Sequence, residues 1–239
     1  VRQLAGADPQ SEKVGTEWLV AGGALLVGMI AAVSHLGHPG GVVRTLSNLG
    51  SAWLSREALS VGLFLVLLAV VAVMRGKAGR GLTVLTAFVG LLAVYSMGMT
   101  YSPPSFPAVN NVLPFVFYLT TAALLGSGVG VRFAPESKKP LVSGILTVSL
   151  IVGLVVYLVV PCIWLSGGEI MKQTGQAWIA SPLYWGRIIV GLALPLAVIW
   201  KTKKAPDWLW VLILAGELMG RAVFFASTVH TATNIGGVY

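Results

Sequence analysis

Charged side chains are scarce in this sequence. Asp, Glu, Lys and Arg together make up 10% of the 239 residues, whereas apolar residues make up 56%. A soluble domain needs about 25% charged residues to cover its surface with polar groups. The shortage of charge therefore excludes a soluble globular domain and predicts an all-α integral membrane protein.

Cysteine and histidine are also rare, with one cysteine, Cys162, and three histidines. A single cysteine excludes a disulfide framework and a cysteine-ligated zinc or iron–sulfur centre. The net charge of +8 comes from basic clusters between apolar runs. That arrangement is typical of loops flanking membrane spans and not of a nucleic-acid-binding face. We therefore expect no nucleic-acid partner and no metal bound by this protein.

Long apolar runs divide the sequence into about seven segments, each near the roughly 20 residues that a helix needs to cross a bilayer. Their approximate ranges are 18–34, 54–74, 81–99, 112–131, 141–165, 182–200 and 208–229. The connections between them are short. The sequence therefore predicts a single transmembrane helical bundle domain over residues 1–239.

Basic residues are distributed unevenly between the two ends of these predicted spans. Eleven Lys and Arg residues fall on one side and three on the other. The more basic side of a membrane protein normally faces the cytoplasm. Segments 35–53, 100–111 and 166–181, together with the C-terminus, are therefore expected to face outward.

Ionisable residues inside membrane spans are costly and are candidates for function. Arg56 and Glu57 lie in the first turns of the second predicted span, and His35 ends the first. Because the connecting segment returns to the same membrane face, His35 and Glu57 can approach each other. A histidine beside a carboxylate suits proton acceptance from a hydroxyl group. The alternative is an interfacial histidine and a glutamate favoured by the positive end of its helix.

The last predicted span carries Glu217 and Arg221 four residues apart, on one helix face. Pairing between them limits the cost of burying either charge, so a structural ion pair is favoured over direct chemistry. Gly216 and Gly220 form a small-xxx-small pattern, which allows another helix to approach closely.

Arg187 lies near the outer end of the sixth predicted span. It can extend its charged end to the interface, stack on neighbouring aromatic rings, or pair with Glu57 or Glu169. With Glu217 and Arg221 it is expected to form a structural ion pair or to line a pocket.

Five short segments, taken in order, carry a family resemblance. They are His35-Leu36-Gly37-His38-Pro39, Leu46-Ser47-Asn48, Trp53-Leu54-Ser55-Arg56-Glu57, Tyr184-Trp185-Gly186-Arg187 and residues 216–225, GELMGRAVFF. The protein resembles the membrane anchor subunit of the DMSO reductase family of respiratory molybdoenzymes. The first and last segments are the specific ones, and the five are scattered over most of the sequence.

The resemblance implies a haem-free subunit in the cytoplasmic membrane of a prokaryote. Such a subunit anchors a molybdopterin catalytic subunit and a four-cluster iron–sulfur subunit, oxidises menaquinol near the outer face, and passes the electrons to the iron–sulfur partner. The family's quinol-site histidine and glutamate correspond to His35 and Glu57, with Arg56 beside them. Related anchors usually have eight spans, so one more helix is expected in the natural protein. Met99 departs from the family pattern, which has a basic residue two positions before Tyr101.

Two other functions stay open on the residues alone. A haem-b-type quinone-reactive anchor needs histidines that face each other across helices, and three histidines allow one such haem at most. A secondary transporter could use Glu57, Arg187, Glu217 and Arg221 as a path. Transporter folds often show internal repeats and helices broken in mid-membrane, and neither is clear in this sequence. An anchor, unlike a transporter, would co-purify with iron–sulfur and molybdenum subunits.

Overall fold

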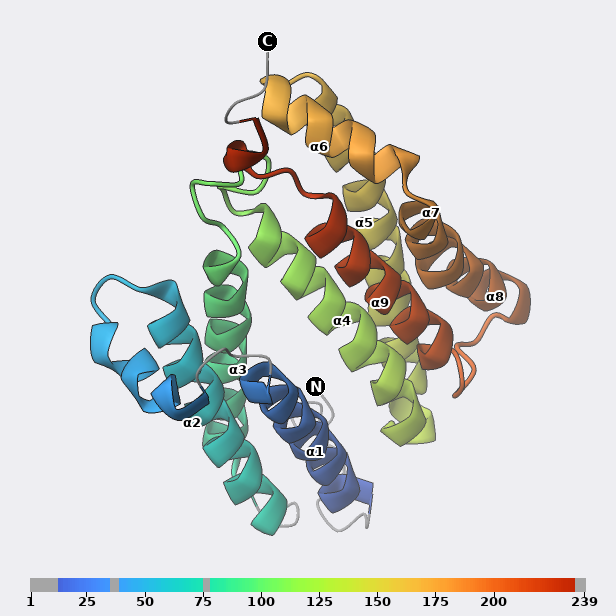
Figure 1. Ribbon diagram of the computed structural model, residues 1–239. Coiled ribbons are helices and arrows are strands. Elements are labelled where there is room, and N and C mark those ends of the chain that lie inside the picture. Colours follow the sequence, from blue (N-terminus) through green and yellow to red (C-terminus); the bar gives the residue numbers. More distant parts are fainter. Residues whose placement is uncertain (1–12, 35–38, 75–77, 235–239) are drawn as a thin grey trace. The chain divides into compact units, whose positions relative to one another are not determined.

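The computed structural model describes residues 13–34, 39–74 and 78–234 (Figure 1). Every regular element in these residues is a helix, which confirms the all-α prediction. The protein divides into two compact units, residues 1–100 and residues 101–239.

Six helical segments of the described residues are long and apolar enough to cross a membrane. They are Trp53–Val73, Arg80–Thr100, Leu113–Phe133, Glu136–Leu165, Pro182–Thr202 and Trp210–Ser227, and they coincide with the second to seventh predicted spans. The first predicted span falls on a helix whose apolar part, Trp18–Ala32, is shorter. Large apolar side chains are exposed along all six long segments, as expected for helices surrounded by acyl chains. The protein is therefore a multi-pass membrane protein.

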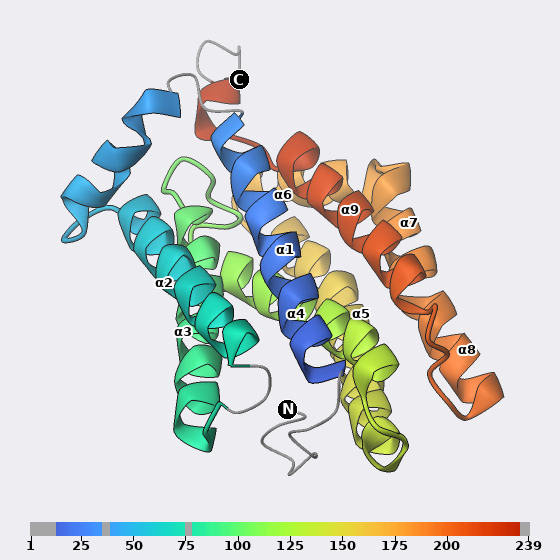
Figure 2. The ribbon, with the colours of Figure 1, turned by 90° about the horizontal axis from the view of Figure 1, so that it is seen from below.

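The first unit contains three helices, α1 (Lys13–Ser34), α2 (Trp53–Val73) and α3 (Arg80–Thr100). Helix α2 packs against both α1 and α3. The 3₁₀ segment η1 (Pro39–Asn48) precedes α2 and contacts it (Figure 2). The buried apolar side chains of this unit come from α2 and α3, and they are Leu68, Val71, Val89 and Ala93. The start of α2 therefore lies beside the end of α3, because the two helices run in opposite directions.

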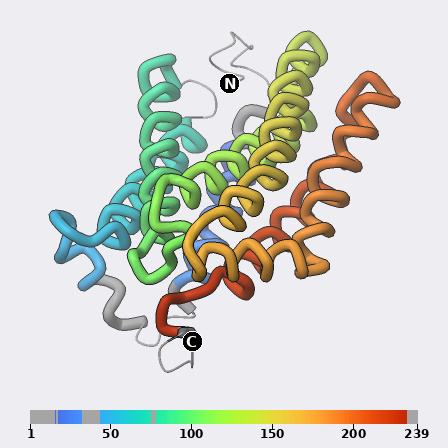
Figure 3. The backbone as a smooth tube through the Cα atoms, turned by 90° about the horizontal axis from the view of Figure 1, so that it is seen from above, coloured from blue at the N-terminus to red at the C-terminus, as the bar shows by residue number. Residues whose placement is uncertain are grey.

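The second unit holds the remaining spans. Its elements are α4 (Leu113–Phe133), η2 (Glu136–Lys138), α5 (Lys139–Leu165), α6 (Glu169–Ala180), α7 (Pro182–Ile188), η3 (Ile189–Ala193), α8 (Leu194–Thr202), α9 (Trp210–Ser227) and η4 (Thr231–Asn234). Helix α4 packs against α5 and α9, and α7 packs against α9 (Figure 3). Helices α7 and α8 form one span through η3, a single π-helical turn. Such turns are rare and often mark functional sites.

Helix α6 is an element that the sequence does not predict. It occupies segment 166–181, which the charge distribution predicts to face outward, and runs across the end of α5 instead of along it (Figures 1 and 3). Trp178 anchors α6, because its side chain is 1% exposed. The aromatic rings around Trp178 come from four neighbouring helices, and they are Phe117, Tyr157, Trp164, Tyr184 and Phe224. With 12 residues, α6 is too short to span a bilayer, so hydropathy alone gives no sign of it.

Candidate functional site

Glu57 lies at the start of α2, in the first unit, and is half-buried. The hydroxyl of Thr100, at the end of α3, lies next to this carboxylate and donates a hydrogen bond to the Ser96 carbonyl at 2.9 Å. The second carboxylate oxygen, Oε2, is buried and has no hydrogen-bond partner among the described residues. A buried acceptor without a partner is unusual in a native fold and is suited to accept a hydrogen bond from a ligand hydroxyl.

Arg56 precedes Glu57 and performs a different task. Its Nε donates to the Leu49 carbonyl at 3.0 Å and its Nη2 donates to the Gly50 carbonyl at 2.7 Å. The guanidinium also lies 4.4 Å from the centre of the Trp53 ring. Adjacent helical residues point in different directions, so Arg56 and Glu57 do not face each other. Arg56 therefore fixes the segment that enters α2.

Aromatic rings lie beside this carboxylate end of the unit. The Trp53 ring packs edge-on against Tyr95 of α3, with 5.6 Å between ring centres. Neither Tyr95 nor Thr100 is identified from the sequence, because only the pairing of α2 with α3 brings them to the start of α2. The structure thus places one carboxylate, one hydroxyl and two aromatic rings at the same end of the first unit.

The predicted approach of His35 to Glu57 stays a prediction. Both His35 and His38 lie outside the described residues. The third histidine, His230, belongs to the second unit. Its Nδ1 accepts a hydrogen bond from the Ala232 amide at 2.8 Å, and its ring packs edge-on against Phe106.

A second group of polar side chains lies inside the second unit. Arg187 of α7 is fully buried, and its Nη2 donates to Glu217 Oε1 of α9 at 2.5 Å. The Thr121 hydroxyl of α4 donates to Glu217 Oε2 at 2.7 Å. The sequence predicts a pair between Glu217 and Arg221, but Glu217 pairs with Arg187, 30 residues away in the sequence. The i,i+4 spacing gives proximity along one helix, whereas the observed partner comes from a neighbouring helix.

Arg221 joins the same network indirectly. Its Nη2 donates to Thr121 Oγ1 at 3.2 Å, and its guanidinium lies 3.7 Å from the centre of the Tyr118 ring. Arg187 likewise lies 4.8 Å from the centre of the Tyr157 ring of α5. Of the alternatives for Arg187, contact with an aromatic ring is present, whereas its ion-pair partner is Glu217 and not Glu57 or Glu169. Two arginines and one glutamate give this group a net charge of +1, with Arg187 and Glu217 buried and Arg221 half-buried. Because a buried charge is costly without a partner, the network ties α4, α5, α7 and α9 into one arrangement.

Glycines allow the helices of this network to approach each other. Gly191 of η3 faces Gly216 of α9, and a Cβ added to Gly191 would lie 2.7 Å from the Gly216 Cα. Gly220 lies one turn further along α9, where an added Cβ would be 3.0 Å from the Tyr157 hydroxyl and 3.2 Å from Arg187 Cδ. The close approach predicted from Gly216 and Gly220 is therefore confirmed.

Replacing Gly216 with Ala should reduce the stability of the second unit by about 1–3 kcal/mol, because the new methyl group meets backbone that cannot move aside. Gly126→Ala is the matched control, since an added Cβ on this α4 glycine meets nothing within 4 Å. Thermal unfolding of the two variants in detergent provides the measurement. Equal melting temperatures would show that α9 does not need this contact.

Comparisons with known proteins agree with the motifs. The sequence model of the DMSO reductase anchor subunit (DmsC) family matches residues 11–226. The C subunit of the anaerobic dimethyl sulfoxide reductase of Haemophilus influenzae is 33% identical over 101 residues, which cover 39% of this protein and 36% of that one. The YnfH subunit of an anaerobic dimethyl sulfoxide reductase of Escherichia coli is 24% identical over 239 residues, which cover 92% of this protein and 82% of that one.

No solved structure matches the protein. The family match nevertheless covers both compact units and includes Glu57, Arg187 and Glu217. The protein belongs to the family of DMSO reductase anchor subunits.

Proposed function

We propose that this protein is the membrane anchor and menaquinol-oxidising subunit of a molybdopterin oxidoreductase complex. It passes electrons from the quinol to a four-cluster iron–sulfur partner, which delivers them to a molybdopterin catalytic subunit. Membership of the anchor family supports the anchoring role. The names of the two relatives support a complex of the anaerobic dimethyl sulfoxide reductase type.

The observation that carries the quinol site is the unpartnered Oε2 of Glu57. Menaquinol oxidation releases two electrons and two protons, so its site needs a proton acceptor at a hydroxyl. Glu57 Oε2 accepts the hydrogen bond from one quinol hydroxyl and then takes its proton. The Thr100 hydroxyl lies next to the carboxylate and gives it a polar neighbour at the end of α3. The site residues therefore fit the substrate that the family resemblance implies.

The other residues position the quinol. Trp53 and Tyr95 offer flat apolar faces or edges to a quinone ring. Arg56 holds the segment before α2 in place through two backbone carbonyls. His35, which lies outside the described residues, is assigned from the family resemblance: it hydrogen-bonds the other quinol hydroxyl and takes the second proton. We assign Arg56 a positioning role and His35 and Glu57 the catalytic roles.

The distribution of Lys and Arg supports a site near the outer face of a prokaryotic cytoplasmic membrane. Glu57 lies at the end of α2 that follows the outward segment 35–53, so the less basic side of the protein carries it. Protons released by Glu57 then leave on the outer side. The iron–sulfur partner receives the electrons on the same side.

The test of this function is direct reduction of the partner by quinol. The intact complex is mixed anaerobically with a short-chain menaquinol, and the iron–sulfur signals are followed by electron paramagnetic resonance. We expect the clusters to become reduced within the turnover time of the complex. Clusters that stay oxidised with quinol but respond to dithionite would contradict the proposal.

A further inference from the structure

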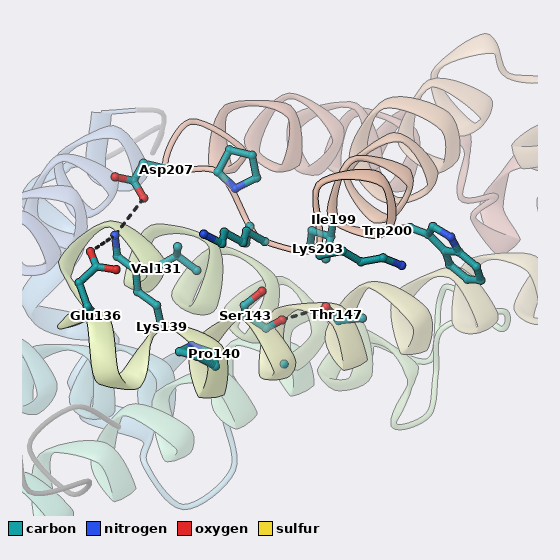
Figure 4. A pocket seen from close by; sticks show the side chains of 14 residues that line it. Val131, Glu136, Lys139, Pro140, Ser143, Thr147, Ile199, Trp200, Lys203 and Asp207 are labelled. Atoms are coloured by element: carbon teal, nitrogen blue, oxygen red, sulfur yellow. Dashed lines mark hydrogen bonds and ion pairs between the residues drawn. The ribbon is translucent and has the colours of Figure 1, made fainter.

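A groove of about 1050 Å³ lies in the second unit, between the start of α5 and the end of α8 (Figure 4). The segment that links α8 to α9 forms one of its walls. This end of the helices carries Lys138, Lys139, Lys201, Lys203 and Lys204, and it is the end that the charge distribution predicts to face the cytoplasm.

The positive charge of this groove is concentrated at two lysines. Lys139 is neutralised, because its Nζ lies 2.8 Å from Glu136 Oε1 and 3.9 Å from Asp207 Oδ1 (Figure 4). Lys203 and Lys204, in contrast, form no ion pair with any residue that the structure describes. With three lysines and two carboxylates the lining has a net charge of +1, and its two cations outside an ion pair lie at the α8 side.

Lys203 adopts a backbone conformation that lysine rarely takes. Its φ is 56° and its ψ is 14°, the left-handed conformation, directly after the end of α8. Among the described residues it is the one non-glycine residue with a positive φ. Glycine is the usual residue at this position of a helix end, because a Cβ is unfavourable there. A lysine at this position is thus less stable than a glycine would be, which is consistent with a functional role for its positive charge.

Beyond the lysines the groove follows α5 into the predicted membrane, along side chains without charge. Ser143, Gly144 and Thr147 give this face of α5 small side chains, and an added Cβ on Gly144 meets nothing within 4 Å. Trp200 borders the groove and is 76% exposed, with Lys203 Nζ 5.5 Å from its ring centre. Exposed tryptophan beside lysine is typical of the level of lipid head groups.

We propose that this groove binds an anionic phospholipid. Lys203 and Lys204 bind the phosphate, and one acyl tail lies along Ser143, Gly144 and Thr147. A lipid fits better than an acidic peptide, because the small-residue slot runs along a membrane-spanning helix and leads away from the charges. Basic pockets between spans on the cytoplasmic side suit the head groups of acidic lipids. The site is independent of the quinol site, since every residue of the groove belongs to the second unit.

The purified, delipidated complex allows the binding to be measured by native mass spectrometry. We expect phosphatidylglycerol to bind more tightly than phosphatidylcholine. Replacing both lysines, as Lys203→Gly with Lys204→Gln, should lower the affinity for phosphatidylglycerol about 25-fold. This figure follows from a loss of roughly fivefold for each lysine at the level of the head groups. Lys201→Gln is the matched control, because Lys201 is a neighbouring basic residue that does not line the groove. It should change the affinity little.

Two further variants distinguish a bound lipid from other ligands of the groove. Gly144→Leu fills the part of the groove proposed to hold the acyl tail. It should therefore weaken the binding of phosphatidylglycerol but not that of glycerol phosphate, which has no tail. Lys203→Gly alone should leave the melting temperature of the lipid-free complex unchanged or raise it, because glycine tolerates the left-handed conformation. Equal binding of both phospholipids, or full competition by inorganic phosphate, would overturn the proposal. So would unchanged phosphatidylglycerol binding by the double lysine variant.

Discussion

Replacing Glu57 with Gln is expected to lower the rate of quinol oxidation by about 10²–10⁴-fold, the usual contribution of a positioned proton acceptor. Glutamine keeps the volume of the side chain and an oxygen that accepts hydrogen bonds. It cannot take a proton from the quinol hydroxyl. The loss should therefore appear in kcat, while the affinity for quinol changes less.

The rate is measured in the intact complex with a short-chain menaquinol and an artificial acceptor for the terminal subunit. Glu169→Gln is the matched control, because Glu169 is an exposed carboxylate of α6 that contacts Gln173 at 3.2 Å. Iron and molybdenum contents of the two preparations show whether the partners are still bound. A Glu57→Gln complex that is fully assembled and as fast as the control would remove Glu57 from the mechanism.

Thr100 offers a graded test of the same carboxylate. Its hydroxyl lies next to the Glu57 carboxylate and donates its one proton to the Ser96 carbonyl at 2.9 Å. Replacing Thr100 with Val keeps the shape of the side chain and removes the polar group next to the Glu57 carboxylate. Since Thr100 acts through Glu57, its loss should cost less activity than the loss of Glu57 itself, as measured by the same quinol oxidation assay.

The spans could be predicted from the sequence because they depend on composition over about 20 residues. A helix in lipid must satisfy its own backbone hydrogen bonds, so a long apolar run has one stable outcome. Helix α6 could not be predicted, for the opposite reason. Its position depends on one buried tryptophan, Trp178, and on rings from four other helices, which no local pattern specifies.

In the candidate sites, too, the features with a local sequence signal could be predicted, and those that depend on packing could not. Glu57, Arg187 and Glu217 could be identified from the sequence, because an ionisable residue inside an apolar run is conspicuous. Their partners could not be identified. Thr100 and Thr121 are ordinary helical threonines until packing places them beside a carboxylate. The π-helical turn that carries Gly191 has one signal in the sequence, Pro195, because a proline inside a helix cannot donate the hydrogen bond to the residue four positions before it. The close contact of Gly191 with α9 has no such signal, and only Gly216 of α9 indicates it.

The largest structural effect is expected from the buried charges of the second unit. Among the described residues, Glu217 is the one carboxylate in its network. It pairs directly with Arg187, and Thr121 links it to Arg221. Glu217→Gln leaves the buried Arg187 without its counter-charge and takes away the carboxylate linked to the half-buried Arg221. Breaking a buried pair of this kind costs about 3–5 kcal/mol. Arg187→Met should be less harmful, because Glu217 keeps the link through Thr121 to Arg221.

The order of the variants separates a charge effect from a packing effect. Melting temperature and yield in membranes should fall most for Glu217→Gln and less for Arg187→Met. The combined variant should recover part of the loss, since its cavity contains only the charge of Arg221. Glu136→Gln is the control, because the same change at the exposed Glu136–Lys139 pair removes a contact that water already screens. If the combined variant is less stable than both single ones, the network stabilises the helices through shape and not through charge.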